Sequence, residues 1–116
     1  MTIEGVLKCL PTLEKIAKAK TRKTRLNLLS KAKSCIFYSI SEISRNVLEG
    51  NIPITEQQKK SLYPYKGKLR TLARKSGVSL RKRKVIVIQK GGALLPLLLW
   101  PALSYLGGKL ADRFTR

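Results

Sequence analysis

The chain has 116 residues, and its 25 Lys or Arg against 6 Asp or Glu produce a formal net charge of +19. Hydrophobic residues make up 43%, which excludes a purely disordered basic tail, while the length leaves room for one small domain only. Self-repulsion at this charge opposes compaction unless a polyanion neutralises it. Nucleic acid is the commonest such partner because bound phosphates release counterions, and an anionic membrane surface is the alternative.

The residue types argue against catalysis. The chain contains no His, so the usual general base and the usual metal ligand are both missing. Its six carboxylates are scattered, and its glycine pairs lack the context and the Lys of a phosphate-binding loop. We therefore expect a non-enzymatic protein with no catalytic residue, metal or cofactor. Cys9 and Cys35 are interpreted as core residues that stay reduced, with a disulfide as the alternative.

The first expected helix lies within residues 1–19, where apolar residues recur at near-helical spacing. Pro11 predicts either a kink or a helix that begins there. The clearest helical pattern covers residues 25–49, with Thr24 as the N-cap and Gly50 as the left-handed stop. The positions that advance by threes and fours in this second helix are Leu26, Leu29, Lys33, Ile36, Ile40, Ile43 and Val47.

A third helix is expected from a capping box at Thr55 and Gln58 to about Ser76. Pro64 lies inside it and predicts a kink or a split at residues 63–65. Three amphipathic helices joined by short loops suffice for a small bundle. The sequence therefore predicts a mainly α fold, with a small three-helix, basic domain at residues 1–76.

Residues 77–90 are expected to form a basic extended segment. A dense basic cluster at residues 80–84 precedes four β-branched residues, Val85–Ile88, which favour extended backbone over helix. Such a segment would have to pack across the bundle, pair with another chain, or remain flexible.

Residues 91–116 form a hydrophobic tail bounded by glycine pairs, with no charge between Lys90 and Lys109. Pro96 and Pro101 favour a kinked interfacial segment over a stable transmembrane span. The alternative is a core helix or strand of the same domain. The residues expected to meet a membrane are Leu94, Leu95, Leu97, Leu98, Leu99, Trp100, Leu103, Tyr105 and Leu106.

The strongest functional indication is an acid-free basic stretch, because residues 59–84 contain eleven Lys or Arg and no Asp or Glu. No zinc-finger, basic-zipper or RNA-recognition motif is present, so we expect phosphate neutralisation with little sequence preference. The residues expected to contact nucleic acid are Lys20, Arg22, Lys23, Arg25, Lys59, Lys60, Lys66, Lys68, Arg70, Arg74, Lys75, Arg81, Lys82, Arg83 and Lys84.

Three segments carry a family resemblance. They are residues 46–60 (Asn-Val-Leu-Glu-Gly-Asn-Ile-Pro-Ile-Thr-Glu-Gln-Gln-Lys-Lys), the leucine-spaced basic residues 66–75, and Val-Ile-Gln-Lys-Gly-Gly at 87–92 before the Leu/Pro tail. The chain resembles, over roughly residues 20–108, small basic proteins of Polinton/Maverick elements and the related adintoviruses. These elements resemble adenoviruses in their virion genes. The resemblance implies a minor virion component similar to adenovirus core or internal capsid proteins, located in the virion and the host nucleus.

One departure from that pattern concerns proteolysis. Adenovirus-type proteases cut after an aliphatic-X-Gly-Gly sequence, and residues 88–92 hold one residue too many between Ile88 and the glycine pair. This puts processing at that site in doubt.

The leading hypothesis is a virion core protein that binds and condenses double-stranded DNA without sequence preference and carries a membrane-active C-terminal segment. The rival is a membrane-lytic or capsid-lining protein, whose charges contact anionic lipid or capsid proteins. A weaker third alternative is a structural partner that adds Val85–Ile88 as a strand to another protein's sheet. Self-association is left open.

Overall fold

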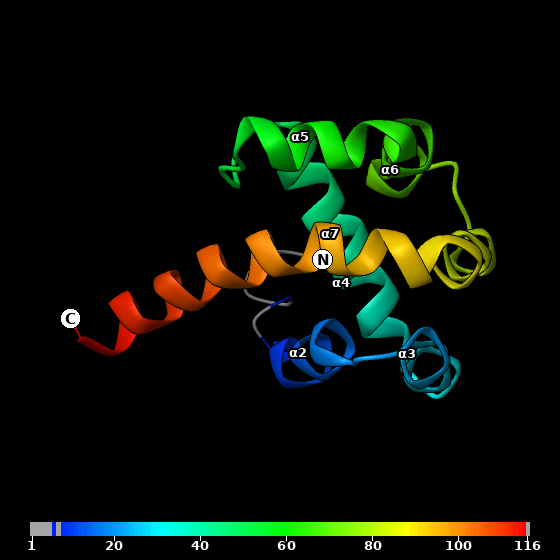
Figure 1. Ribbon diagram of the computed structural model, residues 1–116, viewed down its shortest axis with the longest axis horizontal. Coiled ribbons are helices and arrows are strands. Elements are labelled where there is room, and N and C mark those ends of the chain that lie inside the picture. Colours follow the sequence, from blue (N-terminus) through cyan, green and yellow to red (C-terminus); the bar gives the residue numbers. More distant parts are fainter. Residues whose placement is uncertain (1–5, 7, 116) are drawn as a thin grey trace.

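One helix, α4 (Ser34–Leu48), runs through the middle of the computed structural model, with α6 and α7 packed against it (Figure 1). The structure describes residue 6 and residues 8–115, with side chains described at residues 6, 8–89 and 94–105. Within these residues all regular structure is helical, which confirms the mainly α prediction. The elements are α2 (Leu10–Lys18), α3 (Arg22–Ser30), α4, α5 (Glu56–Leu62), the 3₁₀ turn η1 (Tyr63–Tyr65), α6 (Lys66–Ala73) and α7 (Leu80–Thr115).

The core forms where α7 crosses α4. Helix α4 packs against α6 and α7, and α7 also contacts α2, α3 and α5. Helix α7 therefore connects the pair α2 and α3 with the rest of the core. Figure 1 shows α5 and α6 on one side of α7, and α2 and α3 on the other. The Cα radius of gyration of 13.3 Å is that expected for a compact domain of this length.

Helix α2 begins at Leu10 and carries Pro11 in its first turn, which agrees with the predicted helix start at the proline. Val6 and Lys8 before it are also helical, and Cys9 lies in a turn. The buried side chains of α2 are Leu10, Leu13 and Ile16, which recur at helical spacing, and the adjacent Ala17. Residues 1–5 of the predicted segment lie outside the described residues.

The single helix predicted over residues 25–49 is wrong in one respect, because a break at residues 31–33 divides it into α3 and α4. Thr21, and not Thr24, is the N-cap of α3; its hydroxyl accepts a 3.1 Å bond from the amide of Thr24. The apolar pattern continues across the break because both helices bury apolar residues in the same core: Leu29 belongs to α3 and Ile36 to α4. The predicted end is confirmed: α4 ends at Leu48, and Gly50 has a φ of +80°.

The third predicted helix is confirmed as a split element. Thr55 and Gln58 form the capping box, with bonds of 3.1 and 2.7 Å in the two directions. The split falls at η1, around Pro64, which has no amide hydrogen to continue the α-helical ladder. Helix α6 ends at Ala73, a little before the predicted end at Ser76.

The extended segment predicted at residues 77–90 is wrong, because α7 begins at Leu80 and Val85–Ile88 are helical. The Ser79 hydroxyl accepts a 3.1 Å bond from the amide of Lys82 and thus caps the first turn. Ile86 and Val87 are buried in the core, so packing outweighs the small intrinsic preference of β-branched residues for extended backbone.

The tail predicted as a kinked interfacial segment is instead the main core helix of the domain, the alternative that the sequence left open. Helix α7 continues through Pro96 and Pro101. Its axis turns by 106° between Leu80–Gln89 and Leu94–Tyr105, which brings the apolar second part across α4 (Figure 1). The buried side chains of that part are Leu94, Leu95, Leu98, Leu99, Ala102 and Leu103.

Candidate nucleic-acid interface

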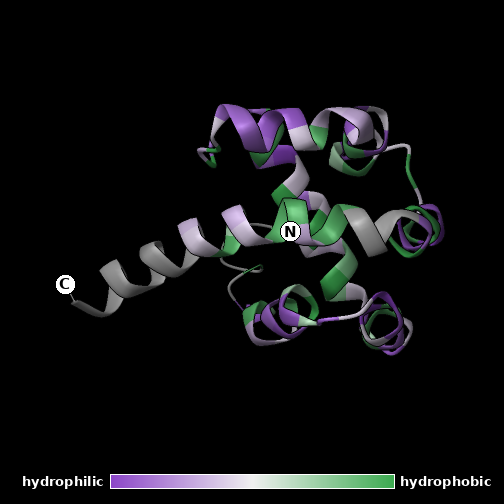
Figure 2. Cartoon of the chain, viewed as in Figure 1, coloured by the Kyte–Doolittle hydropathy of each residue, from purple (hydrophilic) through white to green (hydrophobic). Residues whose placement is uncertain are grey.

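The fifteen cations predicted to contact nucleic acid fall into three groups. Lys20, Arg22 and Lys23 are exposed at or just before the start of α3. Helix α3 lies on the opposite side of α7 from α5 and α6 (Figure 1; same view coloured by hydropathy in Figure 2). A larger exposed group covers α5, η1, α6 and the start of α7; its members are Lys59, Lys60, Lys66, Lys68, Arg70, Arg74, Lys75, Arg81 and Lys82. Lys84 is half-buried, and Arg25 and Arg83 are buried.

Arg25 is buried because its side chain binds the C-terminal end of α2. Its side chain is 6% exposed, and its guanidinium donates to the carbonyl oxygens of Ile16 at 3.3 Å and Ala19 at 2.8 Å. These carbonyls lie at the negative end of the α2 dipole, where a cation is stabilised. Arg25 therefore fixes α3 to α2 and does not belong to the contact set.

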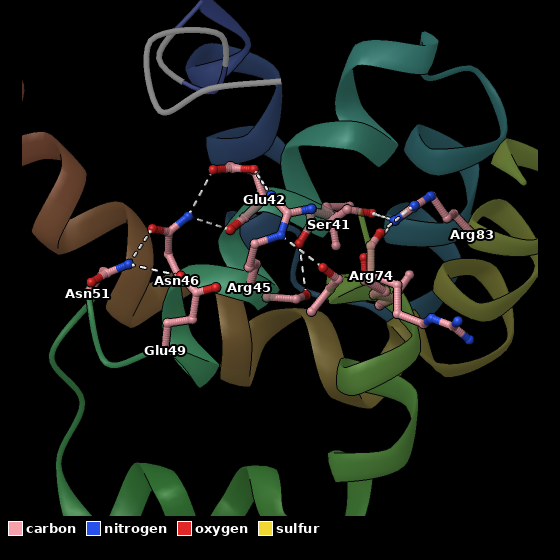
Figure 3. Close-up of polar contacts among 12 residues, drawn as sticks. Ser41, Glu42, Arg45, Asn46, Glu49, Asn51, Arg74 and Arg83 are labelled. Atoms are coloured by element: carbon pink, nitrogen blue, oxygen red, sulfur yellow. Dashed lines mark hydrogen bonds and ion pairs between the residues drawn. The ribbon is translucent and has the colours of Figure 1, made fainter. Parts of the chain in front are cut away.

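Arg83 has the same function at the end of α6. It is 4% exposed, and its guanidinium donates to the carbonyls of Leu72 and Arg74, both at 2.6 Å, and to the Ser41 hydroxyl at 2.9 Å (Figure 3). Its Nε is buried without a partner in the described part of the chain. One side chain of α7 thus ties α6 to α4, and Arg83 also leaves the contact set.

A second arginine, Arg45 of α4, supports the same helix end. Its Nε donates to the Ala73 carbonyl at 2.9 Å, and its Nη1 pairs with Glu42 (Figure 3). Three consecutive carbonyls at the end of α6 are therefore capped by two arginines from different helices. The arrangement holds the loop at residues 74–79 against the core and so positions the cations around it.

The carboxylates of Glu42 in α4 and of Glu49 just after it also accept hydrogen bonds from polar neighbours. The Asn46 amide donates to the Glu42 carbonyl at 2.7 Å and to its carboxylate at 3.1 Å. The Asn51 amide donates to Asn46 and to Glu49, at 3.1 and 3.2 Å (Figure 3). This chain of bonds fixes the turn after α4, which leads to the basic face of α5 and α6.

Three of the exposed cations line one hollow. Arg70, Arg74 and Lys75 line a cavity of about 370 Å³, which we name the basic hollow. Its other lining residues are Arg45, Leu48, Glu49 and Ala73. Since Arg45 is paired with Glu42, the free charge there comes from the three exposed cations against Glu49. The hollow is open to solvent and carries more cations than anions on its rim, a charge balance that favours an anionic group such as phosphate or carboxylate.

Acidic residues occupy little of this face. Lys59 pairs with Glu56 at 3.3 Å, but both side chains are largely exposed and such a pair contributes little. Two lysines contact aromatic rings: the Nζ of Lys66 lies 5.5 Å from the ring centroid of Tyr63, and that of Lys84 lies 5.5 Å from Phe37. The other cations of α6 remain available to a polyanion.

The two cysteines are free thiols. Cys9 precedes α2 and is buried, whereas Cys35 lies in the first turn of α4 and is half-buried. A hydrogen bond with the Cys9 thiol, assisted by burial, raises the pKa of Cys35. The thiols are therefore neighbours, a proximity that sequence spacing did not indicate.

The raised pKa of Cys35 predicts slow alkylation, because only the thiolate is nucleophilic. We expect iodoacetamide to modify Cys35 more slowly at neutral pH than it modifies Cys35 in the Cys9→Ala variant, which lacks the hydrogen bond. Mass spectrometry of time-resolved alkylation across pH measures this difference. Equal rates in the two proteins would contradict the assigned contact.

Most residues predicted to meet a membrane are buried in this domain; Trp100 is 47% exposed, Leu97 and Tyr105 are half-buried, and the side chain of Leu106 lies outside the described residues. Among the described residues, no one helix has both the length and the apolar character to cross a bilayer. Only the bent pair Leu80–Gln89 and Leu94–Tyr105 meets these two criteria together.

Sequence reasoning did not identify Arg45 or the capping function of Arg25 and Arg83. The acceptors of Arg45 and Arg83 at the end of α6 lie 28 and 11 residues away in the chain, so no local motif marks them. Comparisons with protein-family models, with curated proteins and with solved structures found no match to this chain. Its function therefore has to be argued from its own surface.

Proposed function

We propose that this chain is a non-enzymatic protein that binds double-stranded DNA through its phosphates, with little sequence preference. The observation that carries the proposal is the exposed cationic face of α5, α6 and the start of α7. There Arg70, Arg74 and Lys75 line the basic hollow, and Glu49 is the one acidic residue among the residues that line it. Neighbouring cations release several counterions when they meet a polyanion.

The residue types of this face support phosphate contact over base readout. Arg and Lys form charge-assisted bonds to phosphate oxygens, and these bonds position a protein without reading sequence. The helices that carry them are short, at seven and eight residues for α5 and α6. Lys20, Arg22 and Lys23 form a separate basic group across the molecule, and two such groups would let one chain bridge two duplexes and condense DNA.

The family resemblance extends this proposal to a biological setting. From the resemblance of residues 46–60, 66–75 and 87–92 to small basic proteins of Polinton/Maverick elements and adintoviruses, we propose a virion core protein, present in the virion and the host nucleus. The membrane-lytic alternative would require the tail leucines to leave the core, because Leu94, Leu95, Leu98 and Leu99 are fully buried in the folded chain. The capsid-lining alternative would use the same surface cations against a capsid protein.

The test is a salt titration of binding to random-sequence duplex DNA. We expect the triple variant Arg70→Gln, Arg74→Gln, Lys75→Gln to bind more weakly on every sequence, and its salt slope to fall by about one unit per lost phosphate contact. The matched control is the triple variant Lys20→Gln, Arg22→Gln, Lys23→Gln. It removes the same charge from the opposite side and should leave binding of a single short duplex much less affected.

Two results would contradict the proposal. Equal losses in the two triple variants would mean that net charge, and not the α5–α6 face, determines binding. Losses that depend on the DNA sequence would mean that bases are read. Weak DNA binding together with leakage of anionic liposomes, measured in parallel, would instead favour the membrane-active alternative.

A further inference from the structure

A second hollow adjoins the basic hollow, and its walls are apolar. It has a volume of about 210 Å³ and lies between the end of α4, the following loop, α5, η1 and α6. Six of its lining residues are apolar or aromatic and two are lysines; they are Val47, Leu48, Ile54, Leu62, Tyr63 and Leu69, with Lys59 and Lys66. We name it the apolar hollow.

The apolar hollow is open to solvent. Tyr63 is 71% exposed and Leu48 is 42% exposed, so the core of the domain does not cover these two side chains. Large apolar side chains left open beside one another, with a polar rim, are typical of a surface that receives a partner. Phosphate binding at the neighbouring cations does not account for this feature, because a phosphate group gains nothing from an apolar wall.

The two hollows form one continuous surface because Leu48 lines both. Lys59 and Lys66 line the apolar hollow, and Lys66 also lies over the Tyr63 ring. The surface therefore combines a hydrophobic recess, which Lys59 and Lys66 also line, with the adjoining cations of the basic hollow.

We propose that the two hollows together are a docking surface for an acidic peptide segment of another protein. The segment would insert one bulky apolar side chain into the apolar hollow and place carboxylates beside Lys59, Lys66 and the cations of the basic hollow. Carboxylates bind arginine through paired, charge-assisted hydrogen bonds, and a buried apolar anchor supplies most of the affinity in interfaces of this kind.

Charge complementarity selects this occupant over two others. A second copy of the chain carries the same formal charge of +19 and only six acidic residues, so two copies repel one another. Duplex DNA supplies phosphates for the basic hollow but keeps its bases stacked and has no aliphatic side chain for the apolar one. An acidic peptide with an apolar anchor matches both halves. This inference goes beyond the proposed DNA binding and does not depend on it.

The experiment uses the full chain and two synthetic fluorescent peptides. One peptide carries a single leucine flanked by glutamates, and the other has serine in place of that leucine. We expect the leucine peptide to bind about tenfold more tightly in fluorescence anisotropy. We also expect Tyr63→Ala to weaken binding of the leucine peptide about tenfold, whereas the matched variant Tyr38→Ala, which truncates a 40% exposed tyrosine of α4, leaves it unchanged.

Thermal melting followed by circular dichroism checks that both variants fold, which their exposed positions favour. Random-sequence duplex DNA is measured on the same proteins, and Tyr63→Ala should bind it as the unmodified chain does. Equal affinity for the two peptides, or equal effects of Tyr63→Ala and Tyr38→Ala, would overturn the docking proposal without touching DNA binding. It would also be overturned if Tyr63→Ala weakened DNA binding as strongly, or dissociated a dimer of the chain in gel filtration.

Discussion

Replacing Arg83 with methionine is expected to destabilise the domain by about 2 to 4 kcal/mol, because the Leu72 and Arg74 carbonyls lose their buried donor. The Ser41 hydroxyl loses its partner as well, and the negative end of the α6 dipole loses a cation. Methionine keeps most of the volume of the side chain, so the loss reports on hydrogen bonding and charge more than on packing. The midpoint of thermal unfolding should fall by roughly 10 °C.

The matched control for this prediction is Lys82→Met, which removes the same charge from the neighbouring, exposed residue of α7. It should leave the midpoint within a few degrees, since surface substitutions change stability little. If the two variants melted together, Arg83 would not be holding α6 against α4. In that case Arg83 would return to the set of DNA-contacting cations.

Replacing Leu98 with alanine is expected to cost about 3 to 4 kcal/mol of unfolding free energy, which is the price of a cavity in a core. Leu98 is fully buried in the second part of α7. A segment that was free, or inserted in lipid, would contribute nothing to the stability of the domain in solution. Urea unfolding followed by circular dichroism therefore distinguishes a core helix from an independent tail.

Leu48→Ala is the control for this second prediction because it deletes the same atoms at a 42% exposed position of α4. We expect it to cost less than about 1 kcal/mol. A Leu98→Ala variant as stable as Leu48→Ala would show that the second part of α7 leaves the core in solution. That result would revive the membrane-active interpretation of this segment.

The surface chemistry of the candidate site could be predicted in part. The acid-free stretch at residues 59–84 correctly indicated a cationic α5–α6 face, since residues close in sequence on a short helical element stay close in space. Sequence reasoning placed Arg25 and Arg83 with the other cations, because nothing local distinguishes a buried arginine from an exposed one. It also missed the apolar hollow, which is assembled from four elements and the loop between residues 48 and 55.

The amino-acid sequence by itself determined the helical class, a kink or helix start at Pro11, the Thr55–Gln58 capping box, the split at Pro64 and the stop at Gly50. Each of these depends on residues within one or two turns. Only the tertiary structure decided that Val85–Ile88 are helical, that the tail leucines fill the core, and that three arginines cap helix ends. These outcomes depend on long-range contacts. Burial of the apolar part of α7 against α4 outweighs the local preference of β-branched residues for extended backbone. The carbonyls at a buried helix end accept hydrogen bonds from arginines that tertiary packing brings close to them.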